Sequence, residues 1–319
     1  MSDEKALLAA IWAQPHEDTP RLVYADWLQE NGGPAQLARA EFIRVQCELE
    51  LLPTYDPRYD ELEAREQALQ EEWSRQWHQP KKRSHRLVEF SRGFPVLSLQ
   101  QYSVKRLVKL TATPLRAAPL WRYHYGTTGR DLDALLGWRN LHRLTMFALR
   151  SPLPKGWATR LVECPGLRNV SELAFIGCSI TPEELKLVLD AWVGRRLTGL
   201  WLNECPVGDE GIKVLARHPA AAGLRLLRVH TAGFTSRGAK EIADSEYLDR
   251  VRVATFGHNR IGTTGGRHLL RWRALPGIRD LHLMQTGISQ SVEAKIDAVR
   301  KWPNGSWLQR SPQLPKSSS

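Results

Sequence analysis

The chain has 319 residues, of which 42% are hydrophobic and 25% charged, and it carries a net charge of +11. It contains no run of about 18 apolar residues, and its start lacks a basic segment followed by an apolar one, so we expect neither a membrane-spanning segment nor an export signal. The four cysteines form no CxxC pair, which disfavours a disulfide framework and indicates a reducing, cytoplasmic location.

Charge is distributed unevenly along the chain. Residues 1–80 contain 16 acidic and 7 basic residues, a balance of −9, which leaves 18 acidic and 38 basic residues, a balance of +20, for the remainder. Such polarity can hold parts of a chain together, steer an acidic partner or attract nucleic acid. A solvated, arginine-rich surface is the alternative explanation.

The first 80 residues predict a small all-α module. Its first helix is "EKALLAAIWA", capped by Ser2, and its second begins near Asp18 with Pro20 at the first helical position. Gly32 and Gly33 end the second helix, and Pro34 restarts the chain. A third helix is predicted through "AEFIRVQCELELL" and a fourth through "PRYDELEAREQALQEEWSRQWHQ". The basic run "KKRSHR", residues 81–86, is the predicted linker.

The segments "LLAAIWAQPHEDTPRLVYADWLQENG" and "ARAEFIRVQCEL" resemble the bacterial repeat-companion domain. This short helical module usually precedes leucine-rich or helical repeats and continues into "RGF" and a strand, as "SRGFPVLSL" does at 91–99. The resemblance covers about the first fifty residues. It implies a domain arrangement and does not imply any biochemical activity. Within it, we expect a partly buried Asp26 to pair with Arg21 or Arg44 rather than to act as a catalytic acid.

A 27-residue repeat follows. Its copies "VSELAFIGCSI", "LTGLWLNECPV", "LRLLRVHTAGF", "VRVATFGHNRI" and "IRDLHLMQTGI" begin at Val170, Leu197, Leu224, Val251 and Ile278. Their shared pattern of apolar positions is the signature of a leucine-rich repeat. Helix N-caps are predicted once per repeat, at Thr181, Asp209, Ser236, Thr263 and Ser289, and a helix in every unit resembles the ribonuclease-inhibitor type.

The predicted fold class is therefore α/β: a leucine-rich-repeat solenoid of parallel strands with a helix per repeat, preceded by the all-α module. Residues 87–169 are predicted to be irregular N-terminal repeats, residues 170–304 five regular ones, and residues 305–319 a disordered tail.

Cys205 lies beside Glu204, Asp209 and Glu210, as if a reactive thiol stood among carboxylates. In the other repeats its position holds Cys178, Ala232, Asn259 and Thr286. Such residues close the corner after the strand and bond backbone groups. We therefore expect Cys178 and Cys205 to be shielded structural residues.

Because side chains alternate along a strand, the repeat predicts two columns of residues on the concave face. One column reads Arg122, Thr145, Ala174, Trp201, Arg228, Thr255 and His282, and the next reads His124, Phe147, Ile176, Asn203, His230, Gly257 and Met284. We predict that Trp201, Asn203, Arg228, His230, His282 and Met284 bind a partner protein, with Trp201 as an exposed aromatic anchor. The alternative is an incidental mixture that a neighbouring segment partly covers.

The chain shows no sequence motif of a catalytic or cofactor site. His230, His258 and His282 come from different repeats and offsets, so we expect no metal site, and "GTTGGRHLL" at 262–270 is interpreted as a helix entry rather than a phosphate loop. The leading hypothesis is a non-enzymatic protein-interaction scaffold without cofactors. Binding of nucleic acid or another polyanion through the basic repeats is the main alternative, and an enzyme with a site assembled from distant segments is a weaker one.

Overall fold

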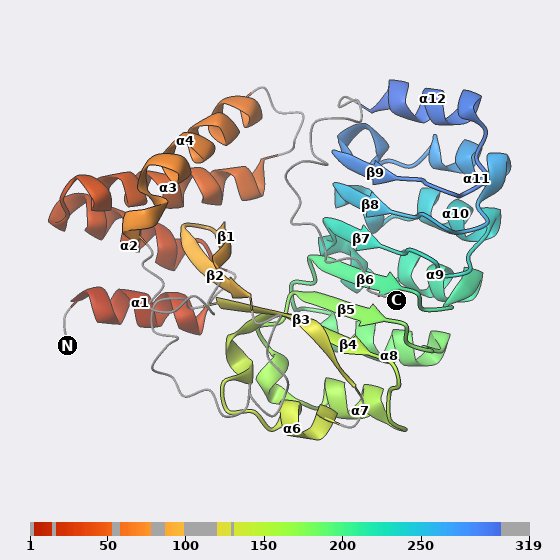
Figure 1. Cartoon of the computed structure of the whole chain (residues 1–319), viewed down its shortest axis with the longest axis horizontal. Helices are drawn as coiled ribbons and strands as arrows, with labels where there is room; N and C mark the ends of the chain where they lie inside the picture. Colours follow the sequence, from red (N-terminus) through yellow and green to blue (C-terminus); the bar gives the residue numbers. More distant parts are fainter. Residues whose placement is uncertain are drawn as a thin grey trace. The chain divides into compact units, whose positions relative to one another are not determined.

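In a computed structural model of the chain, the residues described are 3–14, 17–52, 58–77, 87–98, 120–128 and 131–300, with the backbone alone for 87–89, 95–98 and 120–128. The chain forms two compact units, of which the first comprises Met1–Ser179 and Leu187–Gly199, and the second Ile180–Lys186 and Leu200–Ser319. Helices alternate with parallel strands, so the fold is α/β (Figure 1). The predicted linker 81–86 and tail 305–319 lie outside the described residues. None of the described helices has the length and apolar character that a membrane crossing requires.

The first unit begins with the four predicted helices, which are α1 (Asp3–Ala13), α2 (Thr19–Asn31), α3 (Pro34–Leu51) and α4 (Tyr59–Trp77). Proline occupies the first turn of both α2 and α3, where its missing N–H has no helical partner to lose. The predicted cap at Ser2 lies outside the described residues. Buried apolar side chains of α1, α2 and α3, including Ile11, Leu28 and Ile43, form the core between these helices.

An antiparallel hairpin of β1 (Leu87–Ser91) and β2 (Phe94–Ser98) belongs to the same core. Phe94 is 1% exposed and packs with Tyr24, 5.8 Å between ring centroids. The guanidinium groups of Arg21 and Arg39 lie 5.7 and 5.3 Å from its ring centre. The segment "SRGF" therefore completes the hydrophobic core of the helical module.

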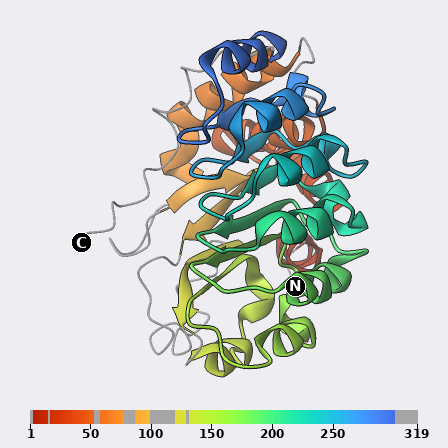
Figure 2. The same ribbon diagram turned by 90° about the vertical axis from the view of Figure 1, so that its right-hand side faces the viewer.

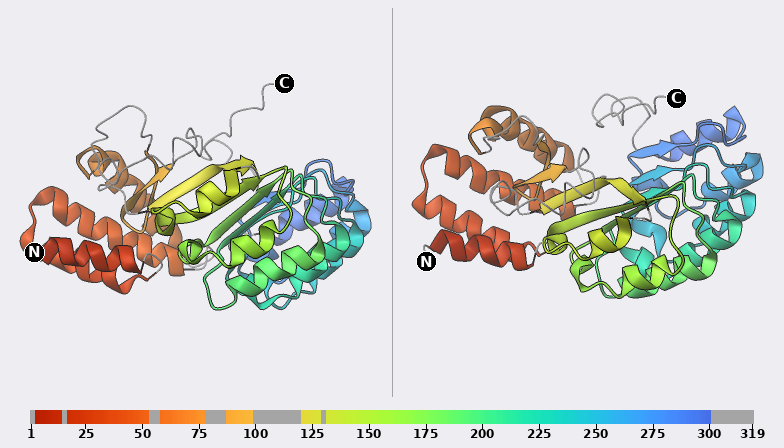
Figure 3. Two further views of the ribbon diagram at one scale, coloured as in Figure 1. Left: turned by 90° about the horizontal axis from the view of Figure 1, so that it is seen from below. Right: turned by 60° about the horizontal axis from the view of Figure 1, so that its bottom comes forward.

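The remaining strands of the first unit are β3 (Leu120–Thr128), β4 (Leu144–Arg150) and β5 (Glu172–Ile176), and its shorter helices are α6 (Leu132–Leu136) and α7 (Trp157–Val162). Strands β2 to β5 pair in parallel in chain order (Figure 3). The columns predicted here are wrong, because Ala148 rather than Thr145 pairs with Ala174, and Arg150 rather than Phe147 pairs with Ile176. All residues of β4 except its last are buried, so the strand has no polar face to mark its register.

The second unit contains the strands β6 (Gly199–Asn203, from Leu200 onward), β7 (Leu226–Arg228), β8 (Val253–Thr255) and β9 (Asp280–His282), and the helices α9 (Gly208–Ala216), α10 (Ser236–Ala243), α11 (Gly262–Leu269) and α12 (Gln290–Val299). Helix α8 (Pro182–Trp192) spans the division between the units. Strands β5 to β9 begin 27 residues apart, at 172, 199, 226, 253 and 280, as the repeat predicts. Figure 2 shows α9 to α12 layered in chain order.

Short 3-10 helices precede most strands, at Leu141–Arg143, Pro165–Leu167, Pro219–Gly223, Leu248–Arg250 and Leu275–Gly277. After each regular strand the backbone turns through a left-handed residue. These residues are Gly177, Glu204, Thr231, His258 and Gln285, with φ between 53° and 65°. The residue that follows each of them is buried, and it is the corner residue that the repeat predicted.

Candidate functional site

The strands of the second unit place the predicted site residues on one face. Arg228 is in register with Thr255, and Thr255 with His282. These three side chains are half-buried, whereas Leu227, Ala254 and Leu281 beside them are 0%, 0% and 4% exposed. Because side chains alternate, the first set lies on the face opposite the core. We call this the strand face; it also carries Trp201, Asn203, His230 and Met284.

Trp201 differs from the expectation of an exposed aromatic anchor. It is 8% exposed, and the guanidinium carbon of Arg228 lies 4.6 Å from the centre of its ring. Adjacent strands are about 5 Å apart, so an arginine can extend over the aromatic ring of its neighbour. The indole of Trp201 is therefore buried, and the half-buried side chains of Arg228 and Asn203 lie at this end of the strand face.

Asp280 and His282 form a hydrogen bond at the other end of the strand face, with 2.9 Å between Asp280 Oδ1 and His282 Nε2. The side chains are 28% and 38% exposed. Although burial raises the pKa of Asp280, the bond from His282 and the charges of Arg228 and Arg300 lower it below its usual value. Asp280 was not predicted as a site residue, because position 280 precedes both predicted columns.

His230 and His258 lie side by side, with ring centroids 4.6 Å apart and planes tilted by 57°. His230 Nδ1 shares a hydrogen bond of 2.9 Å with Thr231 Oγ1. Burial lowers the pKa of His230, His258 lowers it further, and Glu204 opposes both effects. Their contact is not predictable from the repeat pattern, because the two histidines come from different repeats and different offsets.

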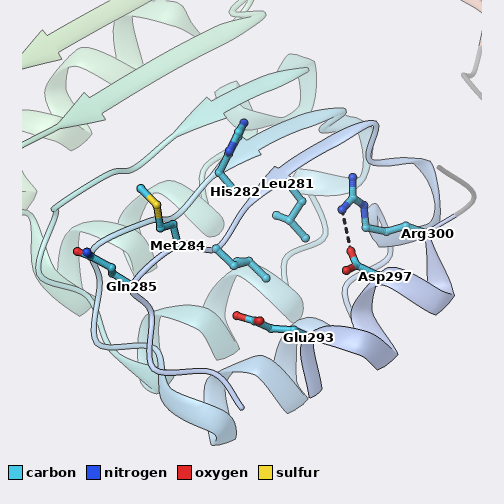
Figure 4. A pocket seen from close by; sticks show the side chains of 8 residues that line it. Leu281, His282, Met284, Gln285, Glu293, Asp297 and Arg300 are labelled. Carbon is cyan, nitrogen blue, oxygen red and sulfur yellow. Dashed lines mark hydrogen bonds and ion pairs between the residues drawn. The ribbon is translucent and has the colours of Figure 1, made fainter. Parts of the chain in front are cut away.

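A cavity of about 420 Å³ opens beside β9 and α12 (Figure 4). At one end lie Met284, which is 65% exposed, and Gln285. At the other end Arg300 pairs with Asp297 at 3.1 Å and donates to the carbonyl oxygens of Ile278 and Arg279. Glu293 and Asp297 contribute carboxylates to a lining that is mostly polar. These acidic residues are not predictable as site residues from the sequence, because acidic residues on a surface helix form no distinguishing pattern.

The corner cysteines are buried and free of disulfides. Cys178 and Cys205 are both 0% exposed. The Cys205 thiol lies 3.4 Å from the carbonyl oxygen of Asn203, and that of Cys178 lies 3.5 Å from the oxygen of Ile176. Asn259 fills the same position with several bonds to backbone groups. These contacts agree with a structural role at the corner.

In the helical module Arg44 and Asp26 form the predicted ion pair at 2.7 Å. Their side chains are 38% and 65% exposed, so the expected burial of Asp26 is wrong. An exposed pair contributes little to stability, about 1 kcal/mol or less.

In comparisons with known proteins, the chain matches no protein-family model and no curated protein. Within the described part of the chain, no group of three or more His, Cys, Asp or Glu residues could hold a metal ion. The strand face and the cavity at its end therefore form the candidate site, as a binding surface with one half-buried cluster of imidazoles.

Proposed function

We propose that the chain is a non-enzymatic binding protein in which a leucine-rich-repeat array presents the strand face to another protein. The N-terminal module would be a repeat-companion domain, and the protein would act in the cytoplasm. The 27-residue spacing of the strands, with one α-helix between successive strands, supports the repeat assignment. Repeat arrays expose broad surfaces that suit protein partners.

The exposed thioether of Met284 carries the proposal. It is 65% exposed beside the half-buried His282, at the edge of a cavity lined mostly by polar groups. Methionine adapts its shape to a partner, and contacts of this kind are enriched at the centre of protein interfaces. Arg228, His230 and Asn203 would supply polar contacts around it, and Trp201 would hold Arg228 in place from beneath.

Affinity capture with two variants tests the proposal. Met284→Asp places a charge at the exposed position without disturbing the core, and we expect it to abolish capture of the partner from a native lysate. Arg267→Ala, at an exposed position on α11, is the matched control and should capture the partner as the wild type does. Equal capture by wild type and Met284→Asp would show that the partner does not bind the strand face.

Polyanion binding remains a second candidate because of one regularity. Arg225, Arg252 and Arg279 occupy the same position in successive repeats, and the backbone N–H groups of Arg252 and Arg279 donate to the carbonyl oxygens of Arg225 and Arg252. This pairing sets three half-buried arginines in line before β7, β8 and β9. Such a row suits successive phosphates.

Salt dependence separates the two functions. Binding to duplex DNA should weaken linearly on a log–log plot against salt, by about 0.9 log units per phosphate contact. Arg252→Ala should reduce that slope by about one contact. Capture that survives nuclease treatment and raised salt, and that needs Met284, favours the protein partner.

A further inference from the structure

The 27-residue repeat places His230 and His258 close together, at the ends of two neighbouring strands. They are 28 positions apart, one more than the period, so His258 lies one residue beyond the position that matches His230. His230 follows β7, and His258 occupies the left-handed corner after β8, with φ of 56°. The two rings meet at 4.6 Å between centroids, and their 57° tilt differs from parallel stacking.

The ring nitrogens of this pair are available to a ligand. His230 Nδ1 is bonded to Thr231, whereas within the described residues His230 Nε2 and both nitrogens of His258 form no hydrogen bond. A neutral imidazole always keeps one nitrogen lone pair. Both side chains are half-buried, so the nitrogens remain within reach of solvent.

Gly257 makes room for the pair. A Cβ atom at this position would lie 3.3 Å from His230 Cδ2 and 3.7 Å from His230 Nε2. The imidazole of His230 therefore lies over the bare backbone of Gly257, beside His258. A larger residue at 257 would displace the His230 ring away from its neighbour.

The separation suits a shared metal ion. Metal–nitrogen bonds to imidazole are about 2.0–2.1 Å, so two nitrogens on one ion lie within about 4 Å of each other. Two imidazoles that bind one ion at these bond lengths and near a tetrahedral angle have ring centres about 5 Å apart, close to the 4.6 Å between His230 and His258. The carboxylate of Glu204 acts electrostatically on His230, and its negative charge would favour a cation there.

We propose that His230 and His258 form a two-imidazole site for a divalent transition-metal ion. Imidazole is a ligand for Cu²⁺, Ni²⁺ and Zn²⁺, whereas Mg²⁺ and Ca²⁺ prefer oxygen, and affinities in such sites rise toward Cu²⁺. Since the described residues contain no group of three or more potential His, Cys, Asp or Glu ligands, the ion keeps open positions for water or an added ligand. The expectation of no metal site, drawn from the different offsets of the histidines, is replaced by this proposal.

The test uses the full chain and two variants that preserve local structure. His230→Phe keeps a ring beside residue 258 but removes its nitrogens. His258→Asn removes the imidazole with a residue that tolerates the left-handed corner. His282→Gln is the matched control, because His282 lies on the same strand face but bonds Asp280.

Calorimetric titration with CuCl₂, NiCl₂, ZnCl₂ and MgCl₂ gives the readout. We expect the wild type and His282→Gln to bind Cu²⁺ most tightly of the four ions and to show no binding of Mg²⁺. Both His230→Phe and His258→Asn should bind one Cu²⁺ fewer, or bind it at least tenfold more weakly. Electron paramagnetic resonance of the wild type with one equivalent of Cu²⁺ should show two nitrogen ligands.

The alternative is a pair of rings packed for structure alone. In that case the two variants would match the wild type in both stoichiometry and affinity, and the proposal fails. Circular dichroism melting establishes that each variant is folded. Should one variant unfold, the other variant and the nitrogen signal of the wild type decide the question, and a signal from fewer than two nitrogens overturns the site.

Discussion

The side-chain oxygen of Gln46 in α3 accepts a hydrogen bond of 2.6 Å from the backbone N–H of Gly93 in the turn between β1 and β2. The amide nitrogen of Gln46 donates to Glu66 in α4 at 2.5 Å. One glutamine thus joins two helices and the hairpin. Arg92 beside it is 9% exposed and pairs with Asp18 and Glu50 at 3.4 and 3.2 Å. The hairpin is therefore tied to the helical module by polar contacts as well as by Phe94.

Gly93→Ala should destabilise this module strongly. Gly93 has φ of +80°, and a Cβ atom there would collide with Cγ1 of Ile43 and lie 2.9 Å from its Cα. Backbone strain and overpacking together should cost about 2–4 kcal/mol in the free energy of unfolding. Urea denaturation followed by circular dichroism measures the loss.

Gly156→Ala is the control for strain alone. Gly156 also has a left-handed backbone, with φ of +70°, but nothing lies within 4 Å of an added Cβ atom. We expect it to cost only about 1 kcal/mol. Equal losses for the two variants would show that the close approach to Ile43 contributes nothing.

Neighbouring leucines on β7 test the register of the second unit. Leu227 is 0% exposed, whereas Leu226 is half-buried and lies on the strand face. Leu227→Asp buries an unpaired charge and should cost about 3–5 kcal/mol, enough to unfold much of the array. Leu226→Asp should be tolerated with a small drop in melting temperature. A reversed order would mean that the inward and outward residues are exchanged.

The regular strands could be predicted from sequence because one physical constraint repeats. Each repeat needs apolar residues facing the core at equivalent strand positions. Leu227, Ala254 and Leu281 occupy one such position in successive repeats, so they can be identified by the period alone. The constraint fails in β4, where Phe147 and Ala148 are both buried and either could face the core. The leucine-rich-repeat and repeat-companion assignments stay predictions.

The candidate site was predicted only in part, because a period gives columns without side-chain conformations. The 27-residue period predicts Arg228 and His282 on one face, and the strand register confirms this placement. It could not predict that the guanidinium of Arg228 covers Trp201, or that His258 leans toward His230. Those contacts depend on long side chains reaching across strands.

Thiol labelling of the folded protein should distinguish one cysteine from three. Cys47, Cys178 and Cys205 are buried and Cys164 is half-buried. Burial, and next the carboxylate of Asp18, raises the pKa of Cys47 to about 12, so its thiol stays protonated at neutral pH. Ellman's reagent at pH 7.5 should titrate one thiol quickly, and all four after denaturation. Because the thiolate is the reactive form, both low exposure and a raised pKa slow the reaction.

Cys164→Ser assigns the fast thiol. This variant should lose the rapid phase, and the slow phase should be unchanged. Cys205→Ala in the same background should cost about 1 kcal/mol or less, since Ala232 fills the equivalent corner. Rapid labelling of Cys205 in folded Cys164→Ser protein would contradict the structural role of the corner cysteines.

Asp209 in α9 holds the start of α10. Its carboxylate accepts hydrogen bonds from the backbone N–H groups of Thr235 and Gly238 at 2.7 and 2.9 Å, and from the Thr235 hydroxyl at 2.8 Å. Arg237 adds an ion pair at 3.1 Å. A negative charge at a helix N-terminus is favourable, so Asp209→Asn should cost about 1–2 kcal/mol at pH 7.

The pH dependence of this loss follows from the pKa of Asp209. Burial raises that pKa, but the bonds from Thr235 and Gly238 and the charge of Arg237 outweigh burial and hold it below its usual value. A depressed folded-state pKa means that the stabilisation is complete above the unfolded-state pKa of about 4 and is lost as pH falls through the folded-state value. Urea denaturation should therefore show a constant difference in the free energy of unfolding between wild type and Asp209→Asn from pH 7 to about pH 5, and this difference should shrink in acid.

The control is Asp249→Asn, at an exposed carboxylate, which should change the free energy of unfolding by no more than about 0.5 kcal/mol throughout. A difference for Asp209→Asn that grows as pH falls would show that its carboxylate is not held as an anion in the folded protein.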